Sequence, residues 1–215
     1  LEAIRQFRQD VGRENALFVH LTLVPYIGTA GELKTKPTQH SVRDLRSIGI
    51  QPDILLCRTD RMLPPEIKRK IALFCDVDEH AVITARDVPT IYEVPMALAA
   101  EGVDTIVLKQ LHLPPTERRM ADWQDLVDRI KHPDDEVTIH VVGKYVGLED
   151  SYKSLSEALC HAGAKHRLKV HVDWVEAEAL EHPEGIRLLE AADGVLVPGG
   201  FGDRGTRGMM RAAQF

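Results

Sequence analysis

The chain has 215 residues, 44% of them apolar and 28% charged, a composition typical of a folded globular protein. The formal net charge of −6 argues against broad nucleic-acid binding, which normally requires a basic face. There is no apolar run of 18 residues and no leader-like segment, so we expect neither a membrane span nor secretion. The cysteines, Cys57, Cys75 and Cys160, are odd in number and lie in apolar contexts, which favours reduced thiols and a cytoplasmic location.

The first half of the chain alternates helical and strand patterns. Apolar spacing predicts a helix over residues 1–14, and the apolar run 16–24 predicts a buried strand. Ser41 and Asp44 form a capping box that predicts a helix from Ser41 to about Gly49. Strands are predicted at 52–58 and 80–86, and helices at 64–74 and 90–103, the last with a kink or restart at Pro95. Such alternation predicts a largely parallel sheet covered on both faces.

The pattern changes between residues 113 and 135, where a proline pair, a short amphipathic helix around Trp123 and an acidic turn indicate an interdomain linker. Strands are then predicted at 136–143, 167–176 and 194–200, with helices at 151–164 and 185–192. Three strands make about half of a typical doubly wound domain. We therefore expect one α/β domain over 1–112, a linker over 113–135 and a partial doubly wound domain over 136–215.

The segment ELKTKPTQHS, Glu32–Ser41, is a candidate polyanion site. Lys34 and Lys36 can hold phosphates as compact charges, and the helix predicted to follow adds oriented amides. Hydrogen-bonding groups for phosphate, sugar or base come from Thr35, Thr38, Gln39 and Ser41. The alternative is a mobile surface loop that is polar because loops are. No phosphate loop supports the site, because Gly143-Lys144 has Thr138 in place of the upstream glycine and is followed by Tyr145.

The segment VPGGFGDRG, Val197–Gly205, is the second candidate. A strand that ends in consecutive glycines brings bare backbone amides to the carboxyl edge of a parallel sheet, where two amides can hold an oxyanion. The alternative is a tight turn that needs positive φ.

Neither catalysis by a nucleophile nor a metal site is indicated. The sequence has no cysteine or serine flanked by glycines at a strand-to-helix turn, and each cysteine is more typical of a core thiol. The histidines show no paired spacing with a nearby acid, so we expect no metal site made by this chain alone. Lys70, Arg58 and Asp87 are more typical of solvated charges unless a shared site unites them.

Several segments, taken together, closely resemble the CTP synthase family. They are HLTLVPY, GELKTKPTQHSVRDLRSIGIQPDIL, RKIALFCDV, EVTIHVVGKY and LVPGGFGDRG, in the order of the family. The resemblance runs from Leu1 to Phe215. It implies an amidoligase domain of dethiobiotin-synthetase type followed by a class I glutamine amidotransferase domain, so the chain would span the end of the first and the start of the second.

The resemblance also implies a reaction. ATP phosphorylates the C4 oxygen of UTP, and ammonia from L-glutamine hydrolysis displaces the phosphate to give CTP. Magnesium would accompany ATP, CTP would inhibit, GTP would activate, and the enzyme would be a cytoplasmic homotetramer.

The resemblance implies site residues as well. The family's UTP and CTP segment corresponds to Lys34, Thr35, Lys36, Pro37, Thr38 and Gln39, joined by Lys70. The adenine turn corresponds to Asp87 and Val88, with Arg58 beside it. Gly199 and Gly200 would bind glutamine and its oxyanion, and Arg204 lies in a loop that would contact the activator GTP.

The sequence departs from the family pattern in what it lacks. The phosphate loop, the magnesium-binding acids and the Cys-His-Glu triad are missing, and we expect the triad beyond Phe215. No catalytic or metal residue is therefore assigned to this chain, which we expect to be incomplete and inactive alone.

Two other functions are kept. One is a non-catalytic module that senses UTP or CTP and drives assembly. The other is a glutamine amidotransferase-like domain of different specificity fused to an unrelated helper. No nucleic-acid or membrane partner is expected.

Overall fold

A computed structural model describes residues 1–144, 146–147 and 149–215, with the backbone alone for 149–150. The chain forms two compact units, Leu1–Met120 and Ala121–Phe215, and each is described by itself. The boundaries expected at 112 and 135 stay predictions. Tyr145, the last residue of the EVTIHVVGKY segment, lies outside the described residues.

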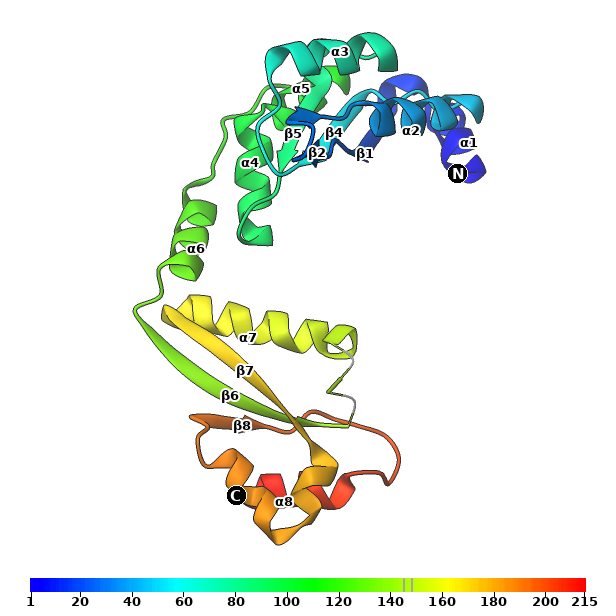
Figure 1. The fold of residues 1–215 in the computed structure, drawn as a ribbon. Helices are drawn as coiled ribbons and strands as arrows, with labels where there is room; N and C mark the ends of the chain where they lie inside the picture. Colours follow the sequence, from blue (N-terminus) through cyan, green and yellow to red (C-terminus); the bar gives the residue numbers. More distant parts are fainter. Residues whose placement is uncertain (145, 148) are drawn as a thin grey trace. The chain divides into compact units, whose positions relative to one another are not determined.

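The first unit is an α/β fold around a parallel sheet of order β1-β4-β5 (Figure 1). Its strands are β1 (Val19–Leu23), β2 (Tyr26–Ile27), β3 (Glu32–Leu33), β4 (Ile54–Thr59) and β5 (Val82–Arg86). Its helices are α1 (Glu2–Val11), α2 (Lys36–Ser47), α3 (Pro65–Cys75), α4 (Val94–Ala100) and α5 (Val103–Gln110). Short 3₁₀ turns are η1 (Arg13–Asn15), η2 (Glu79–Ala81) and η3 (Ile91–Glu93), and β2 pairs with β3 antiparallel. The predicted parallel α/β sheet is confirmed.

Helices cover both faces of the central strand β4 and of its neighbour β5. On one face, α2 and α3 pack on β4 through a core that includes Val42, Leu55 and Ile71. On the other face, Ile54 and Ile83 pack with Ile106 of α5. Both predicted coverings of β4 and β5 are therefore present.

Strand β1 differs from the expectation of a fully buried strand. Val19, Leu21 and Leu23 are 47%, 61% and 53% exposed. Alternate residues of a strand point to opposite faces, so these three share one face of an outer strand. In the part of the chain that the structure describes, α4 and α5 reach β4 and β5 but leave this face of β1 exposed. The apolar run predicted the strand correctly and its burial wrongly.

Helix α2 begins five residues before the predicted start at Ser41. The amide of Gln39 donates to the carbonyl of Thr35 at 3.1 Å, which is the first bond of the helix. Pro37 fits in the first turn because its missing N–H has no partner to lose there. Ser41 bonds His20 Nε2 at 2.8 Å, so the expected capping box is not formed.

The second unit has a parallel sheet of order β7-β6-β8 (Figure 1). Its elements are α6 (Ala121–Lys131), β6 (Asp135–Gly143), η4 (Glu149–Tyr152), α7 (Lys153–His166), β7 (Leu168–Glu176), η5 (Ala177–Glu181), η6 (Pro183–Leu189), β8 (Gly194–Leu196) and α8 (Thr206–Gln214). Helix α7 covers one face of this sheet, and η5, η6 and α8 lie on the other.

Two predicted elements of the second unit are corrected. The helix expected at 185–192 is the 3₁₀ segment η6, in which the amide of Gly185 bonds the carbonyl three residues back, at His182. Gly185 packs so closely on η5 that an added Cβ would lie 2.0 Å from the Ala179 carbonyl oxygen, and this contact favours the tighter coil. The last strand ends at Leu196, so Val197–Gly200 lie outside it.

No helix in the described ranges is long and apolar enough to cross a membrane.

Candidate functional site

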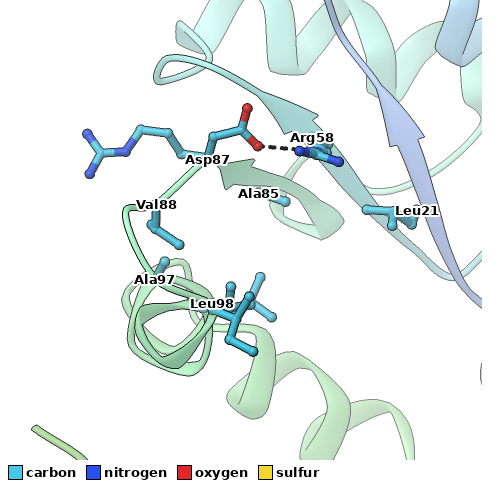
Figure 2. A pocket seen from close by; sticks show the side chains of 10 residues that line it. Leu21, Arg58, Ala85, Asp87, Val88, Ala97 and Leu98 are labelled. Atoms are coloured by element: carbon cyan, nitrogen blue, oxygen red, sulfur yellow. Dashed lines mark hydrogen bonds and ion pairs between the residues drawn. The ribbon is translucent and has the colours of Figure 1, made fainter. Parts of the chain in front are cut away.

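A cavity of about 340 Å³ opens at the carboxyl ends of β4 and β5. The lining residues come from the strand ends, the following turn and α4, and are Leu21, Arg58, Ala85, Arg86, Asp87, Val88, Ile91, Val94, Ala97 and Leu98. Ligands of parallel α/β sheets bind at this edge, and pockets for small molecules begin at about 300 Å³. The walls are mainly apolar, with charged groups gathered at one side (Figure 2).

The three residues predicted to contact adenine meet in this pocket (Figure 2). Arg58 Nε donates to Asp87 Oδ1 at 2.8 Å, and both side chains are more than half exposed. The amide of Asp87 donates to the carbonyl of Thr59 at 2.9 Å, which continues the β4–β5 ladder past the strands. The register that pairs Arg58 with Ala85 therefore places Asp87 and Val88 beside Arg58.

The segment predicted to bind a pyrimidine nucleotide forms the start of α2. Lys34, Lys36 and Pro37 are exposed, and Gln39 is half-buried. Thr35 and Thr38 are buried, and their hydroxyls bond within the protein. Thr38 donates to the carbonyl of Leu23 at 3.1 Å, and Thr35 accepts from Gln39 at 3.1 Å. The Thr38 hydroxyl thus fixes the helix start on β1, and the Thr35 hydroxyl bonds within the helix start, while Lys34 and Lys36 are exposed.

Lys70 of α3 adds charge to the same region. Lys34 bonds Glu32, and this hydrogen bond, followed by the charge of Lys34, lowers the pKa of the Glu32 carboxyl. The charge of Lys70 lowers the pKa of Glu32 further. Lys34 and Lys70 therefore both act on the Glu32 carboxylate, which belongs to β3 just before α2.

The cysteines have the environments expected from the sequence. Burial raises the pKa of Cys57 to about 12 and that of Cys75 to about 11, and it also raises the pKa of Cys160. All three are free thiols. Since the thiolate is the nucleophile, none is activated for covalent catalysis.

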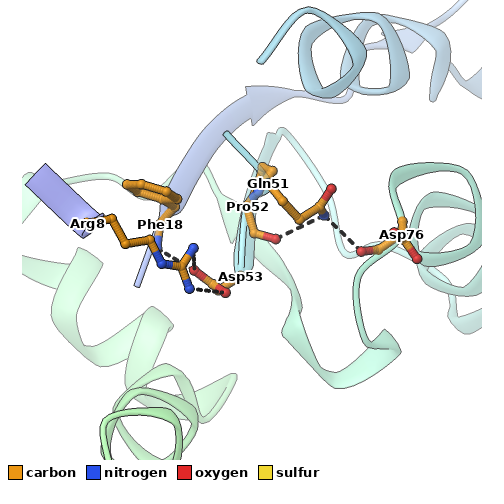
Figure 3. Close-up of polar contacts among 6 residues, drawn as sticks. All are labelled: Arg8, Phe18, Gln51, Pro52, Asp53 and Asp76. Atoms are coloured by element: carbon orange, nitrogen blue, oxygen red, sulfur yellow. Dashed lines mark hydrogen bonds and ion pairs between the residues drawn. The ribbon is translucent and has the colours of Figure 1, made fainter. Parts of the chain in front are cut away.

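A separate polar network lies at the opposite, amino-terminal edge of this sheet (Figure 3). Asp53 accepts from Arg8 at 3.1 Å and from the amide of Phe18 at 2.6 Å, while the Arg8 guanidinium stacks 4.7 Å above the Phe18 ring. Gln51 donates to the carbonyl of Asp76 at 2.8 Å. These bonds tie α1 and the end of α3 to the sheet, so we assign this network to folding.

The glycine-rich segment of the second unit leaves the sheet after β8. Gly199 and Gly200 are exposed, and a Cβ at Gly199 would meet nothing within 4 Å. Positive φ occurs at Gly202 (+78°) and Gly205 (+66°), so the segment contains the tight turn that was the alternative expectation for it. Arg204 donates to both oxygens of Glu178 at 2.9 Å, and this hydrogen bond lowers the pKa of Glu178.

No group of three metal-ligating side chains lies together among the residues that the structure describes.

The fold and the two sites define a class of protein with two parallel α/β units. A small-molecule pocket lies at the sheet edge of the first unit, and a glycine-rich loop lies at the sheet edge of the second. Residues 148–215 match the family model "Glutamine amidotransferase class-I", and residues 1–113 match the model "CTP synthase N-terminus". The chain belongs to the CTP synthase family. The match assigns residues 1–113 to the N-terminal domain as a whole. It does not assign them to the end of that domain, as the sequence analysis expected.

Curated relatives agree with this membership. The chain is 60% identical over 215 residues to the CTP synthase of Acidobacterium capsulatum, covering 100% of this chain and 39% of the relative. It is 56% identical over 221 residues to the CTP synthase of Methanocaldococcus jannaschii, covering 100% of this chain and 41% of the relative. The chain thus spans about two fifths of the length of these relatives.

Proposed function

We propose that this chain is part of a glutamine-hydrolysing CTP synthase, which aminates UTP to CTP with ATP and ammonia from L-glutamine. The observation that carries the proposal is that one chain matches both the CTP synthase N-terminus and the class I amidotransferase models, in that order. A ligase that takes ammonia from glutamine needs both activities.

We propose that the cavity at β4 and β5 holds the adenine of ATP. Its apolar walls, which include Leu21, Ala97 and Leu98, suit the faces of a flat heterocycle. The Asp87 carboxylate is an acceptor for the exocyclic amine, and the backbone of Val88 offers a donor and an acceptor at the rim. Arg58 orients Asp87 and offers a planar guanidinium for stacking.

We propose that the start of α2 holds UTP, with CTP binding as an inhibitor at the same residues. Lys34, Lys36 and Lys70 supply positive charge for the triphosphate, and the amides of the first helical turn add to it. Gln39 is the group for uracil or ribose. Thr35, Pro37 and Thr38 contribute by shaping the helix start, since the threonine hydroxyls already have partners within the protein.

We propose that Gly199 and Gly200 offer the backbone groups for glutamine and its oxyanion, and that Arg204 belongs to a loop that responds to GTP. The phosphate grip, the Mg²⁺ ligands and the Cys-His-Glu triad belong to other parts of the whole protein. Residues 1–112 then belong to the synthetase domain, and the chain is inactive alone. Cytoplasmic location and a homotetramer complete the proposal.

The test is an assay of the complete reading frame that contains this chain. The expected result is CTP formation that requires UTP, ATP and Mg²⁺ together with either glutamine or an ammonium salt. The 215-residue chain is assayed in parallel, and we expect it to release no ammonia from glutamine. A complete protein that binds UTP and CTP, assembles with them and forms no CTP would instead support the sensing module.

The fused-domain alternative makes a different prediction for Lys34→Ala. It leaves UTP binding intact, whereas our proposal expects it to weaken.

A further inference from the structure

Lys144 is a buried lysine that follows β6 in the second unit. Lys144 is 5% exposed. Among the side chains that the structure describes, its ammonium forms no ion pair with a carboxylate. Lysine is almost never buried this far unless its ammonium has specific partners. The sequence showed this residue only as part of an incomplete phosphate-loop pattern.

The partners are backbone carbonyls of the glycine-rich loop. Lys144 Nζ donates to the carbonyl of Phe201 at 3.1 Å and to that of Gly202 at 2.5 Å. The stem of Lys144 passes directly under Gly200, where an added Cβ would lie 3.3 Å from Cε and 3.4 Å from Cδ. The lysine therefore contacts three consecutive residues of a loop more than fifty positions away in the sequence.

These bonds fix the direction of the loop amides. A peptide unit is planar and trans, so its N–H points opposite to its C=O. Holding the carbonyls of Phe201 and Gly202 on Lys144 turns the amides of Gly202 and Asp203 away from the lysine. Charge-assisted bonds of this kind are stronger than neutral ones, so the two peptide planes are held firmly.

Lys144 is itself held by rigid neighbours. Its amide donates to the Tyr152 hydroxyl at 3.2 Å, and the Tyr152 ring packs on Trp174 of β7 with ring centroids 5.1 Å apart. Gly143 allows this approach, because a Cβ there would lie 2.6 Å from the Tyr152 hydroxyl oxygen. The ammonium thus connects the glycine loop to the framework of β6 and β7.

We propose that Lys144 is a positioning residue of the glutamine-hydrolysis site. Its ammonium holds Phe201 and Gly202, which directly follow Gly199 and Gly200, so that the backbone groups of Gly199 and Gly200 are in place before glutamine binds and the oxyanion forms. This inference rests on the proposed function. It gives Lys144 no contact with the reacting atoms and no proton to transfer. Preorganised donors of this kind lose much of their effect when they are free to reorient.

The test uses the complete enzyme with Lys144→Met, which keeps the length of the stem and removes the charge and the donors. We expect kcat for glutamine hydrolysis to fall at least about tenfold, the loss that follows from one or two charge-assisted hydrogen bonds. CTP formation from ammonium salt should stay within about twofold of the wild type, because that route bypasses the loop. KM for glutamine should change less than kcat.

Two further variants separate positioning from general damage. Lys165→Met removes an exposed lysine of α7 and should leave both activities at wild-type values. Lys144→Arg keeps the charge and the donors and should recover part of the glutamine hydrolysis. If Lys144→Met hydrolyses glutamine at the wild-type rate, or loses the ammonium-dependent reaction equally, the inference is wrong.

If the Met variant does not fold, Lys144→Gln takes its place, since its shorter amide falls short of the loop carbonyls and predicts the same selective loss. A folded Gln variant with unchanged glutamine hydrolysis would overturn the role. Failure of the proposed function is recognised separately, because the wild-type protein would then form no CTP from UTP, ATP and ammonium salt.

Discussion

The two parallel sheets of this chain use their carboxyl edges differently. In the first unit the edge carries exposed charged side chains, such as Arg58 and Asp87, beside an apolar cavity. In the second unit the edge carries bare backbone, with Gly199 and Gly200 exposed and the loop held from beneath by Lys144. One edge offers side chains whose ends are free to adapt, and the other offers peptide groups that need a buried support.

This difference predicts how each edge responds to substitution. Removing an exposed side chain takes away a contact and leaves the fold in place. Adding or removing atoms around closely packed backbone moves the backbone itself, because interiors are packed without spare volume. The first edge should therefore lose affinity without losing stability, and the second should lose stability or loop order.

The largest effect is expected from Gly208→Ala in α8. A Cβ there would lie 1.6 Å from the carbonyl oxygen of Ala177, so α8 must move off η5. We expect the free energy of unfolding of the second unit to fall by about 3 kcal/mol. Urea unfolding followed by tryptophan fluorescence reports this unit, because Trp123 and Trp174 both lie in it.

The control for this substitution is Gly199→Ala, where an added Cβ meets nothing within 4 Å. Its unfolding free energy should change by less than about 0.5 kcal/mol. Equal midpoints for the two variants would show that α8 is not closely packed on η5.

The next effect concerns Lys34→Ala, just before α2, and Lys70→Ala on α3. Each should weaken UTP binding to the complete enzyme by about tenfold or more, since one charged phosphate contact contributes about 1.5 to 3 kcal/mol. Calorimetric titration measures the affinity, and the melting temperature should not change. Lys109→Ala, which removes an exposed lysine of α5, is the matched control. A loss of stability as large as the loss of affinity would contradict the comparison.

A smaller effect is expected from Glu101, which joins the edge strand β5 to α3. It accepts from Lys68 at 2.5 Å and from the amide of Thr84 at 2.8 Å. Burial acts to raise the pKa of Glu101, but the hydrogen bonds from Lys68 and Thr84 and the charge of Lys68 bring it below the ordinary value of 4.5. The carboxylate therefore stabilises the folded state above pH 4.5, and this contribution is lost as the pH falls through the lowered pKa.

Glu101→Gln should remove that pH dependence and cost about 1 to 2 kcal/mol at pH 7. Hydrogen exchange of the Thr84 amide is the measurement, and it should become faster in the variant. Glu66→Gln on the exposed side of α3 is the control and should leave the exchange rate unchanged. An unchanged exchange rate in Glu101→Gln would show that the hydrogen bond from the Thr84 amide to Glu101 does not protect the edge strand β5.

The smallest change in stability is expected from Asp87→Asn. Exposed ion pairs contribute about 0.2 to 1 kcal/mol, so the melting temperature should barely move. The ATP affinity of the complete enzyme should fall by about fivefold, which is the loss expected when one hydrogen bond of ordinary strength is removed. Asp104→Asn breaks a comparable exposed pair with Arg118 at 2.7 Å, away from the pocket, and should leave ATP affinity unchanged. Equal ATP affinities for the two variants would remove Asp87 from the proposed adenine site.

Local sequence signals predicted elements best where one strong cue acted alone. The strand at 52–58 and the helix opened by Pro64 and Pro65 appear as β4 and α3. The start of α2 was missed because Ser41 and Asp44 imitate a capping box, while the true start has Thr35 as the N-cap and is held on the end of β1 by Thr38. The 3₁₀ form of η6 was missed because the close contact between Gly185 and Ala179 is tertiary.

The sequence by itself determined the parallel α/β class, the inert character of the three thiols and the family, because periodicity, the apolar neighbours of each cysteine and the order of the motifs can be read along the chain. Only the tertiary structure brought Arg58 to Asp87, since that meeting depends on the register of β4 with β5. It also turned Thr35 and Thr38 inward and placed Lys144 under the glycine loop. Such contacts join residues that are distant in the chain, and no local pattern records which carbonyl a buried ammonium will reach.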